Sequence, residues 1–119
     1  MSIQRYKETS FAIVDQEEPI HSVSDALDVL ANARYLMDCT GLMIPKECFS
    51  ADFFDLQSGL AGEIFQKFIN YRMKLAIIGD ITEYAERSKS FSDLVTECNR
   101  GMNICFAKNN EEARPFFDA

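Results

Sequence analysis

The chain has 119 residues, which is the usual length of one domain, so we expect a single domain over residues 1–119. Its 12 basic and 19 acidic residues give a net charge of −7, and a field of that sign repels a nucleic-acid backbone as partner. No apolar run approaches the ~20 residues of a membrane-spanning helix, and the first residues lack the apolar core of a signal peptide. We therefore expect a cytoplasmic protein that does not enter a membrane.

In chain order, the apolar residues first predict two short strands, Ile3–Thr9 and Phe11–Asp15. A helix should follow, capped by Ser22 or Ser24 and ended by Thr40-Gly41, because hydroxyl residues cap helix starts and glycine follows helix ends. Its apolar positions recur at helical spacing: Ala26, Leu27, Leu30, Ala33 and Met37.

The middle of the chain predicts a strand, a helix and another strand. Residues 42–49 indicate one strand that Pro45 interrupts or ends. Ser50 stands where a helix cap is expected, and residues 60–72 have the clearest amphipathic helical pattern. Residues 75–80 are continuously apolar up to Gly-Asp, which is typical of a strand buried on both faces with helices on each side.

The last part of the chain repeats the alternation. A helical turn is expected at Thr82–Arg87, a helix at Ser90–Asn99 and a strand at Met102–Ala107. A final helix should be capped by Asn109 or Asn110, and its two phenylalanines should pin it to the core. Unless Pro115 lies in the first turn, it should kink or shorten this helix.

The element order predicts an α/β fold. Two leading strands followed by alternating helices and strands favour a single small domain, with a mainly parallel, mixed sheet and helices packed on it. The same periodicity gives a predicted core: Ile13, Leu27, Leu30, Phe54, Leu60, Ile64, Phe68, Ile77, Ile78, Phe91, Leu94 and Phe106.

The four cysteines, Cys39, Cys48, Cys98 and Cys105, form no Cys-x-x-Cys pair, and the one histidine, His21, is remote from them. Zinc sites usually contain a close ligand pair, so the spacing favours free thiols that are buried or half-buried. A disulfide framework is the alternative, which the missing signal peptide disfavours. We expect no metal and no cofactor.

The start of the helix at residues 60–72 is a candidate switch or anion site. Gly59 and Gly62 would let main-chain N–H groups approach an anion, but the known phosphate-loop patterns are absent. Close packing of the helix on the sheet is the favoured explanation for these glycines. Ser58 either caps the helix or is a phosphorylation site, and the cap is favoured.

The carboxyl ends of the strands are a candidate ligand site. Asp15 and Asp80 follow two predicted strands, and ligands of open α/β sheets bind at such ends. Two carboxylates there could bind a metal or act as acid and base, although capping of the following turn is favoured for Asp80. Asn70, on the polar face of the preceding helix, is a further candidate. His21 is expected to be an ordinary surface or boundary histidine, and no catalytic residue is assigned.

Four segments resemble the signature of a bacterial family known as domain-of-unknown-function family 4180. The longest is FFDLQSGLAGEIFQKFINYR at 53–72, and the others are DALD at 25–28, KLAIIGD at 74–80 and ECNRG at 97–101. Together they span nearly the whole chain. The resemblance implies membership of that family but no activity, cofactor or catalytic residue.

The order of elements is also similar to that of STAS domains, the anti-sigma-factor-antagonist type. Those domains carry a segment of the type Asp-Ser-Ser-Gly-Leu-Gly at the start of their second helix, where serine phosphorylation controls partner binding. Gln57-Ser58-Gly59-Leu60-Ala61-Gly62 falls at the corresponding place and departs from that pattern at Gln57. The resemblance implies a role for Ser58 as a switch.

Two classes of function follow. The first is a non-enzymatic regulatory or protein-interaction module of STAS-like type with a protein partner. The alternative is a small ligand-binding domain or enzyme that uses Asp80, Asp15 and the amides near Gly59. Self-association as a homodimer is expected, because ten phenylalanines exceed what a small core readily hides. The candidates for that interface are Phe53, Phe54, Phe116 and Phe117, each of which could equally be a core residue.

Overall fold

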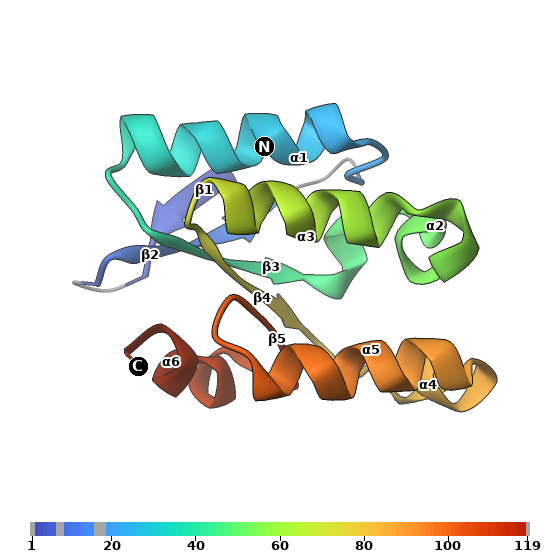
Figure 1. The fold of residues 1–119 in the computed structure, drawn as a ribbon. Coiled ribbons are helices and arrows are strands. Elements are labelled where there is room, and N and C mark those ends of the chain that lie inside the picture. The colour runs from blue at the N-terminus through green and yellow to red at the C-terminus, as the bar shows by residue number, and fades with distance from the viewer. Residues whose placement is uncertain (1, 7–8, 16–18, 119) are drawn as a thin grey trace.

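The computed structural model describes residues 2–6, 9–15 and 19–118 of the chain. Helices and strands follow one another as β1 (Ser2–Arg5), β2 (Phe11–Asp15), α1 (Val23–Ala31), β3 (Gly41–Pro45), α2 (Ala51–Phe54), α3 (Leu60–Asn70), β4 (Lys74–Ile78), α4 (Thr82–Arg87), α5 (Lys89–Arg100), β5 (Ile104–Ala107) and α6 (Asn110–Asp118) (Figure 1). A π-helical turn, Asn32–Leu36, extends α1. Two 3₁₀ turns, Lys46–Cys48 and Leu56–Ser58, flank α2.

The five strands form one sheet in the order β1-β2-β3-β4-β5. Strands β2 to β5 are parallel, and β1 pairs antiparallel with β2 at the edge. The mixed, mainly parallel sheet and the α/β class are therefore confirmed. The register sets Leu42 opposite Leu75, and Leu75 opposite Ile104, so that apolar side chains form continuous rows across the sheet.

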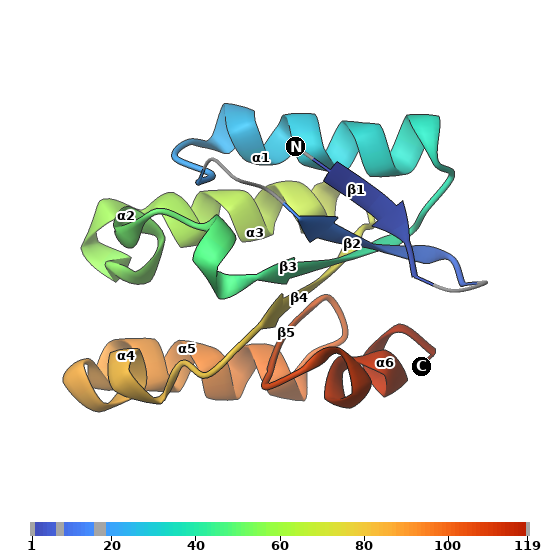
Figure 2. The same cartoon turned by 180° about the vertical axis from the view of Figure 1, so that it is seen from behind.

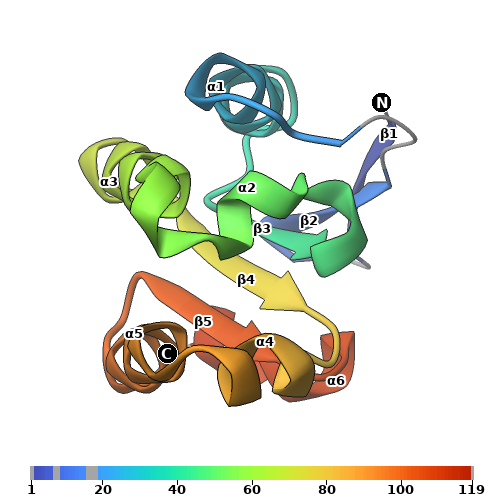
Figure 3. The same ribbon diagram turned by 90° about the vertical axis from the view of Figure 1, so that its right-hand side faces the viewer.

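The helices cover the two faces of the sheet unequally. Crossovers between parallel strands are right-handed, and because all three step the same way across the sheet, α1, α3 and α5 lie on one face. The chain then turns back after β5, and α6 packs on the other face against β3, β4 and β5 (Figure 3). From behind, β1 and β2 have no helix in front of them in the described part of the chain (Figure 2).

The core consists of two apolar clusters, one on each face. The larger lies between the sheet and α1, α3 and α5, and the smaller lies under α6. Strand β4 contributes to both, with Leu75 and Ile77 on one face and Ala76 on the other, as expected for a strand buried on both sides. The predicted core is confirmed for its buried members, Leu30, Phe54, Ile64, Phe68, Ile77, Phe91 and Phe106. The remaining members are only half-buried: Ile13, Leu27, Leu60, Ile78 and Leu94.

The start of α1 confirms the sequence prediction, whereas its end does not. The Ser22 side chain caps the helix and accepts a hydrogen bond from the Asp25 main-chain N–H at 3.1 Å. The helical turns finish at Leu36, and Asp38 takes the left-handed conformation (φ 52°) that redirects the chain. The predicted end at Thr40-Gly41 is wrong, because Gly41 is already the first residue of β3.

Gly41 is required by packing against α6. A Cβ atom at this position would lie 2.6 Å from the ring of Phe117, which stacks on Phe11 with ring centroids 4.4 Å apart. The Lys74 ammonium donates to the Phe116 carbonyl at 2.9 Å. The two phenylalanines therefore pin α6 to the core as predicted, and the helix continues through Pro115.

Other element boundaries shift by a few residues. Strand β1 ends at Arg5, short of the predicted Thr9; residues 7 and 8 of that prediction lie outside the described residues. Strand β3 ends at Pro45, which confirms proline as its terminator. Strand β5 begins at Ile104, and the predicted first residue, Met102, lies exposed in the preceding turn.

The four cysteines are free thiols. Cys39, Cys48 and Cys105 are buried and Cys98 is half-buried, as predicted. Burial raises the pKa of the Cys98 thiol to about 11 and that of the Cys105 thiol to about 12, so both are protonated at neutral pH. None of the described helices combines the length and the apolar composition needed to span a membrane.

Candidate functional site

Ser58 ends the turn between α2 and α3, and its side chain is exposed. Its hydroxyl oxygen lies 2.6 Å from the Asp52 carbonyl oxygen and 2.7 Å from that of Asp55. It also accepts a hydrogen bond from the Leu60 main-chain N–H at 3.2 Å. The hydroxyl of this exposed residue therefore joins α2 to the first residue of α3.

Gly59 and Gly62 lie beside Ser58 but do not pack on the sheet. A Cβ at either position would meet nothing within 4 Å, and both residues are exposed. The expectation that they permit close helix packing is wrong, because Ala61 is the residue that enters the core. Gly59 is needed for the turn itself, since its φ of 77° lies in the left-handed region.

The first turn of α3 leaves donors free next to Ser58. The first main-chain bond into α3 runs from the Glu63 N–H to the Gly59 carbonyl. The N–H groups of Ala61 and Gly62 have no acceptor among the described residues. Free N–H groups and the helix dipole favour an anion at this position.

The charges around Ser58 are acidic. Asp52 and Asp55 precede it and Glu63 follows it in the first turn of α3. The Asp55 carboxylate accepts the main-chain N–H of Gln57 at 3.1 Å, which stabilises the turn. A further negative charge at Ser58 would therefore strengthen an acidic surface.

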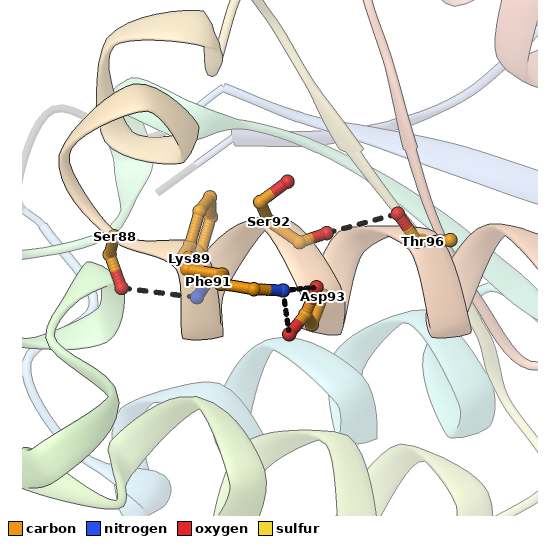
Figure 4. A network of polar contacts seen from close by, with 6 residues as sticks. All are labelled: Ser88, Lys89, Phe91, Ser92, Asp93 and Thr96. Atoms are coloured by element: carbon orange, nitrogen blue, oxygen red, sulfur yellow. Dashed lines mark hydrogen bonds and ion pairs between the residues drawn. The ribbon is translucent and has the colours of Figure 1, made fainter.

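A hollow of about 310 Å³ lies between this turn and the start of α5. It is lined by Phe54, Asp55, Leu56, Gln57, Ser88 and Ser90. The Ser88 hydroxyl caps α5 by accepting a hydrogen bond from the Phe91 main-chain N–H at 3.1 Å (Figure 4). Within α5, the Lys89 ammonium lies 3.4 Å from the Asp93 carboxylate, and the Thr96 hydroxyl donates to the Ser92 carbonyl. Sequence reasoning missed the two serines at the start of α5 that line this hollow, because no motif connects them to Ser58.

Aromatic packing connects this turn to α4. Phe54, in the last turn of α2, stacks on Tyr84 with ring centroids 4.1 Å apart. Phe53 is fully buried against Phe49 at 4.0 Å. Both α2 phenylalanines belong to the core, so Phe53 and Phe54 are wrong as candidates for a dimer interface.

Asp15 and Asp80 lie at the carboxyl ends of β2 and β4, as predicted, but line separate hollows. The hollow at Asp15 measures about 530 Å³ and includes Gln4 and Ile13. The hollow at Asp80 measures about 160 Å³ and includes Lys108. The two carboxylates are therefore not brought together in one cavity.

The Asp80 carboxylate is engaged with the start of α4. It accepts the Thr82 hydroxyl at 2.5 Å and the Thr82 main-chain N–H at 2.9 Å. These two bonds hold the pKa of Asp80 below its ordinary value, with smaller contributions from Lys46 and Lys108. Sequence reasoning missed Lys46, whose ammonium donates to the Asp80 carbonyl at 2.5 Å and whose stem covers Gly79.

Asn70 and His21 lie apart from the Ser58 turn and from the strand-end carboxylates. Asn70 ends α3 and accepts a hydrogen bond from the Gln66 side chain at 2.9 Å, far along the helix from Ser58. His21 is exposed, as predicted, and its main-chain N–H, not its ring, binds Asp25. Within the described ranges, no three His, Cys, Asp or Glu side chains come together in a way that could hold a metal.

The comparison with protein families agrees with the sequence signature. The family model described as "Domain of unknown function (DUF4180)" matches residues 6–115. Neither the comparison with curated proteins nor that with solved structures gives a match.

Proposed function

The chain belongs to the DUF4180 family of unknown function, and for this member we propose a small, non-enzymatic regulatory or protein-interaction module of STAS-like type, with Ser58 as its switch position. The observation that carries the proposal is the combination of exposure and bonding at Ser58. Ser58 is an exposed residue, as a modifying enzyme requires, and its hydroxyl links α2 to α3.

Phosphorylation would change both sides of this link. A phosphoryl group replaces the hydroxyl hydrogen, so the bonds to the Asp52 and Asp55 carbonyls are lost. The new oxygens would face the free N–H groups of Ala61 and Gly62 at the positive end of α3. The fold would survive, while the position of α2 and the charge of the surface would change.

The effect on a partner follows from charge. A phosphate adds about −1.5 to −2 charge to a surface that already carries Asp52, Asp55 and Glu63. Such a change repels an acidic partner or recruits a basic one. Because Phe54 stacks on Tyr84, a shift of α2 would also reach α4 and enlarge the affected surface.

The STAS-like part of the proposal is supported by the order of elements and by the place of Ser58 immediately before α3. The departure at Gln57 changes the side chain that lines the neighbouring hollow, which suggests that partner contacts differ from those of STAS domains. The proposal includes a cytoplasmic location and a homodimer. Phe116 and Phe117 remain candidates for that interface, because both are half-buried.

Mass spectrometry of the protein isolated from the cells that produce it tests the switch. We expect a phosphorylated peptide that contains Ser58. Phosphate found only on other serines, such as Ser88 or Ser90, would contradict the proposal. These two serines provide an internal control because they line the hollow next to the Ser58 turn.

A small ligand-binding domain or enzyme is the second candidate. It is favoured by the hollow at the ends of β4 and β5, which contains Asp80 and Lys108 and lies where α/β sheets bind ligands. A thermal-shift screen with Mg²⁺, nucleotides and small organic acids tests it. A concentration-dependent rise in Tm that Asp80→Asn removes would favour this candidate over the interaction module.

A further inference from the structure

Strand β1 leaves one edge of the sheet open. Its inner edge pairs with β2, and no strand of the described chain follows it in the order of the sheet. Figure 3 shows β1 at the margin of the sheet, with no described helix beyond it. An open edge of this kind presents main-chain N–H and C=O groups that can pair with a further strand.

The main-chain groups of Ile3 and Arg5 point away from β2. The Tyr6 N–H donates to the Phe11 carbonyl at 3.0 Å, so these two residues form a hydrogen-bonded pair of the antiparallel ladder. Such pairs alternate with pairs that are not hydrogen-bonded, and the next hydrogen-bonded pair contains Gln4. The N–H and C=O groups of Ile3 and Arg5, which flank Gln4, are therefore directed outward, and no described residue binds them.

The opposite edge of the sheet, at β5, is partly occupied by the protein itself. The Phe106 N–H in β5 donates to the side-chain oxygen of Asn99, in α5, at 2.8 Å. A further strand could pair fully with β5 only by displacing Asn99. The β1 edge is therefore the one that is ready to pair, and two copies that join there form a closed dimer and not a filament.

We propose that β1 pairs antiparallel with the β1 strand of a second copy, about a two-fold axis at Gln4. The inference rests on the homodimer of the proposed function and gives that dimer an interface. In this register Ile3 of each copy lies opposite Arg5 of the other, and the two residues exchange both of their main-chain hydrogen bonds. The two five-stranded sheets become one continuous sheet.

The charges of β1 suit a second copy of an acidic protein. The strand contains Arg5 and no acidic residue, although each chain carries −7 overall. The register centred on Gln4 sets no like charges directly opposite each other, whereas a register centred on Arg5 would oppose the two guanidinium groups. Each Arg5 side chain already donates to the Thr9 and Met37 carbonyls of its own chain, and the pairing leaves these bonds in place.

An extended segment of a different protein is the alternative occupant, since it could form the same main-chain bonds. The second copy is favoured because Ile3 and Arg5 supply both sides of the pairing. No matching sequence is then required in another protein.

The pairing would also join two hollows. Gln4 is exposed, lies opposite Ile13 and lines the hollow of about 530 Å³ at Asp15, on the face where no described helix lies in front of β1 and β2 (Figure 2). Directly opposite residues of an antiparallel pair have Cβ atoms about 4.5–5.5 Å apart. The two Gln4 side chains would therefore meet on the axis, at the rim that the two hollows share.

Disulfide crosslinking of the intact protein through Gln4→Cys tests this register. A disulfide requires Cβ atoms about 3.5–4.5 Å apart, which two residues that face each other on the axis reach with a small adjustment. We expect mild oxidation to give a covalent dimer about tenfold or more faster than with Asp15→Cys. Asp15 is the matched control, because it is exposed and lines the same hollow but lies on β2, one strand farther from the axis. Peptide mapping should place the bond at position 4, since the native cysteines are buried or half-buried.

Light scattering at protein concentrations up to about 300 µM tests the edge itself. Because β1 has four residues, the interface is small and the dimer should be weak. Ile3→Pro removes an outward N–H without removing a bond to β2, so this variant should remain a monomer. Ile3→Ala is the matched control, because it also shortens a side chain that packs against the larger core cluster but keeps the N–H. It should still form the dimer.

The contrary results are distinguishable from one another. Equal crosslinking of Gln4→Cys and Asp15→Cys, or a dimer mass that persists in a folded Ile3→Pro protein, would overturn the proposal. A dimer that Phe116→Ala removes and Ile3→Pro does not would also overturn it, while the proposed homodimer would stand with its interface at α6. A monomer at every concentration, without crosslinking, would overturn both the interface and the homodimer and would leave the Ser58 switch unaffected.

Discussion

The hydroxyl oxygen of Ser58 lies 2.6 Å from the carbonyl oxygen of Asp52, and this contact joins the turn before α3 to helix α2. The same oxygen accepts a hydrogen bond from the Leu60 main-chain N–H at 3.2 Å, so one atom of an exposed residue connects two helices. A chemical change at that atom therefore alters both the end of α2 and the start of α3.

Replacing Ser58 with alanine should lower the free energy of unfolding by about 1 kcal/mol, the net value of a typical hydrogen bond. The fold itself should be retained, because the side chain is exposed. Urea denaturation measures the change, with Ser90→Ala as control, since the Ser90 hydroxyl bonds to no described residue. Equal stabilities of the two variants would show that the Ser58 bonds contribute nothing.

Gly59 and Gly62 should respond in opposite directions to alanine. Gly59→Ala should destabilise by roughly 1–2 kcal/mol, because its φ of 77° is costly for a residue with a Cβ. Gly62→Ala should stabilise by roughly 0.5–1 kcal/mol, because Gly62 is exposed within a helix and a Cβ there meets nothing. Thermal denaturation of the two variants gives both signs; a destabilising Gly62→Ala would reveal a contact absent from the structure.

The main features of the fold were predictable because they depend on local patterns. Ser22 caps α1 and Pro45 ends β3 for reasons contained in a few neighbouring residues. Gly41 was misassigned to the end of a helix because its role depends on Phe117, which comes from the far end of the chain. A glycine that makes room for a distant ring has no local signature.

The candidate site was predictable only in part. The position of Ser58 before α3 follows from the glycine and the helical pattern beside it. Its bond to Asp52 and the hollow it shares with α5 require the tertiary arrangement of α2, α3 and α5. Asp15 and Asp80 were both assigned correctly to strand ends, but the pattern could not show that they line different hollows.

Ile77→Asp should abolish folding. Ile77 is fully buried in β4, and an unpaired charge there costs several kcal/mol against a total stability of about 5–15 kcal/mol. Circular dichroism during heating should show no cooperative transition. Leu36→Asp is the control, since Leu36 is 79% exposed and should tolerate the charge. A soluble Ile77→Asp protein that melts cooperatively would be incompatible with a central buried strand.

Asp80 should contribute to acid sensitivity. Its pKa is lower in the folded protein than its ordinary value of 3.8, because the ionised carboxylate accepts two bonds from Thr82. The ionised carboxylate therefore contributes its full stabilisation at pH values above the ordinary pKa of 3.8. This contribution is lost as the pH falls through the lower pKa of the folded protein. Urea denaturation should show a wild-type advantage over Asp80→Asn at about pH 6 that shrinks by about pH 3. A pH-independent difference would mean that ionisation of Asp80 is not involved.

The proposed switch at Ser58 would control which proteins this domain binds. The most direct measurement compares Ser58→Asp with Ser58→Ala as baits in a lysate of the cells that produce the protein, with bound proteins quantified by mass spectrometry. Both variants should melt cooperatively at similar temperatures, because the side chain is exposed and the dipole of α3 tolerates the added charge. We expect at least one partner whose bound amount differs between the two folded variants by about tenfold or more. Identical sets of partners, in equal amounts, would contradict it and leave Ser58 as a structural link between α2 and α3.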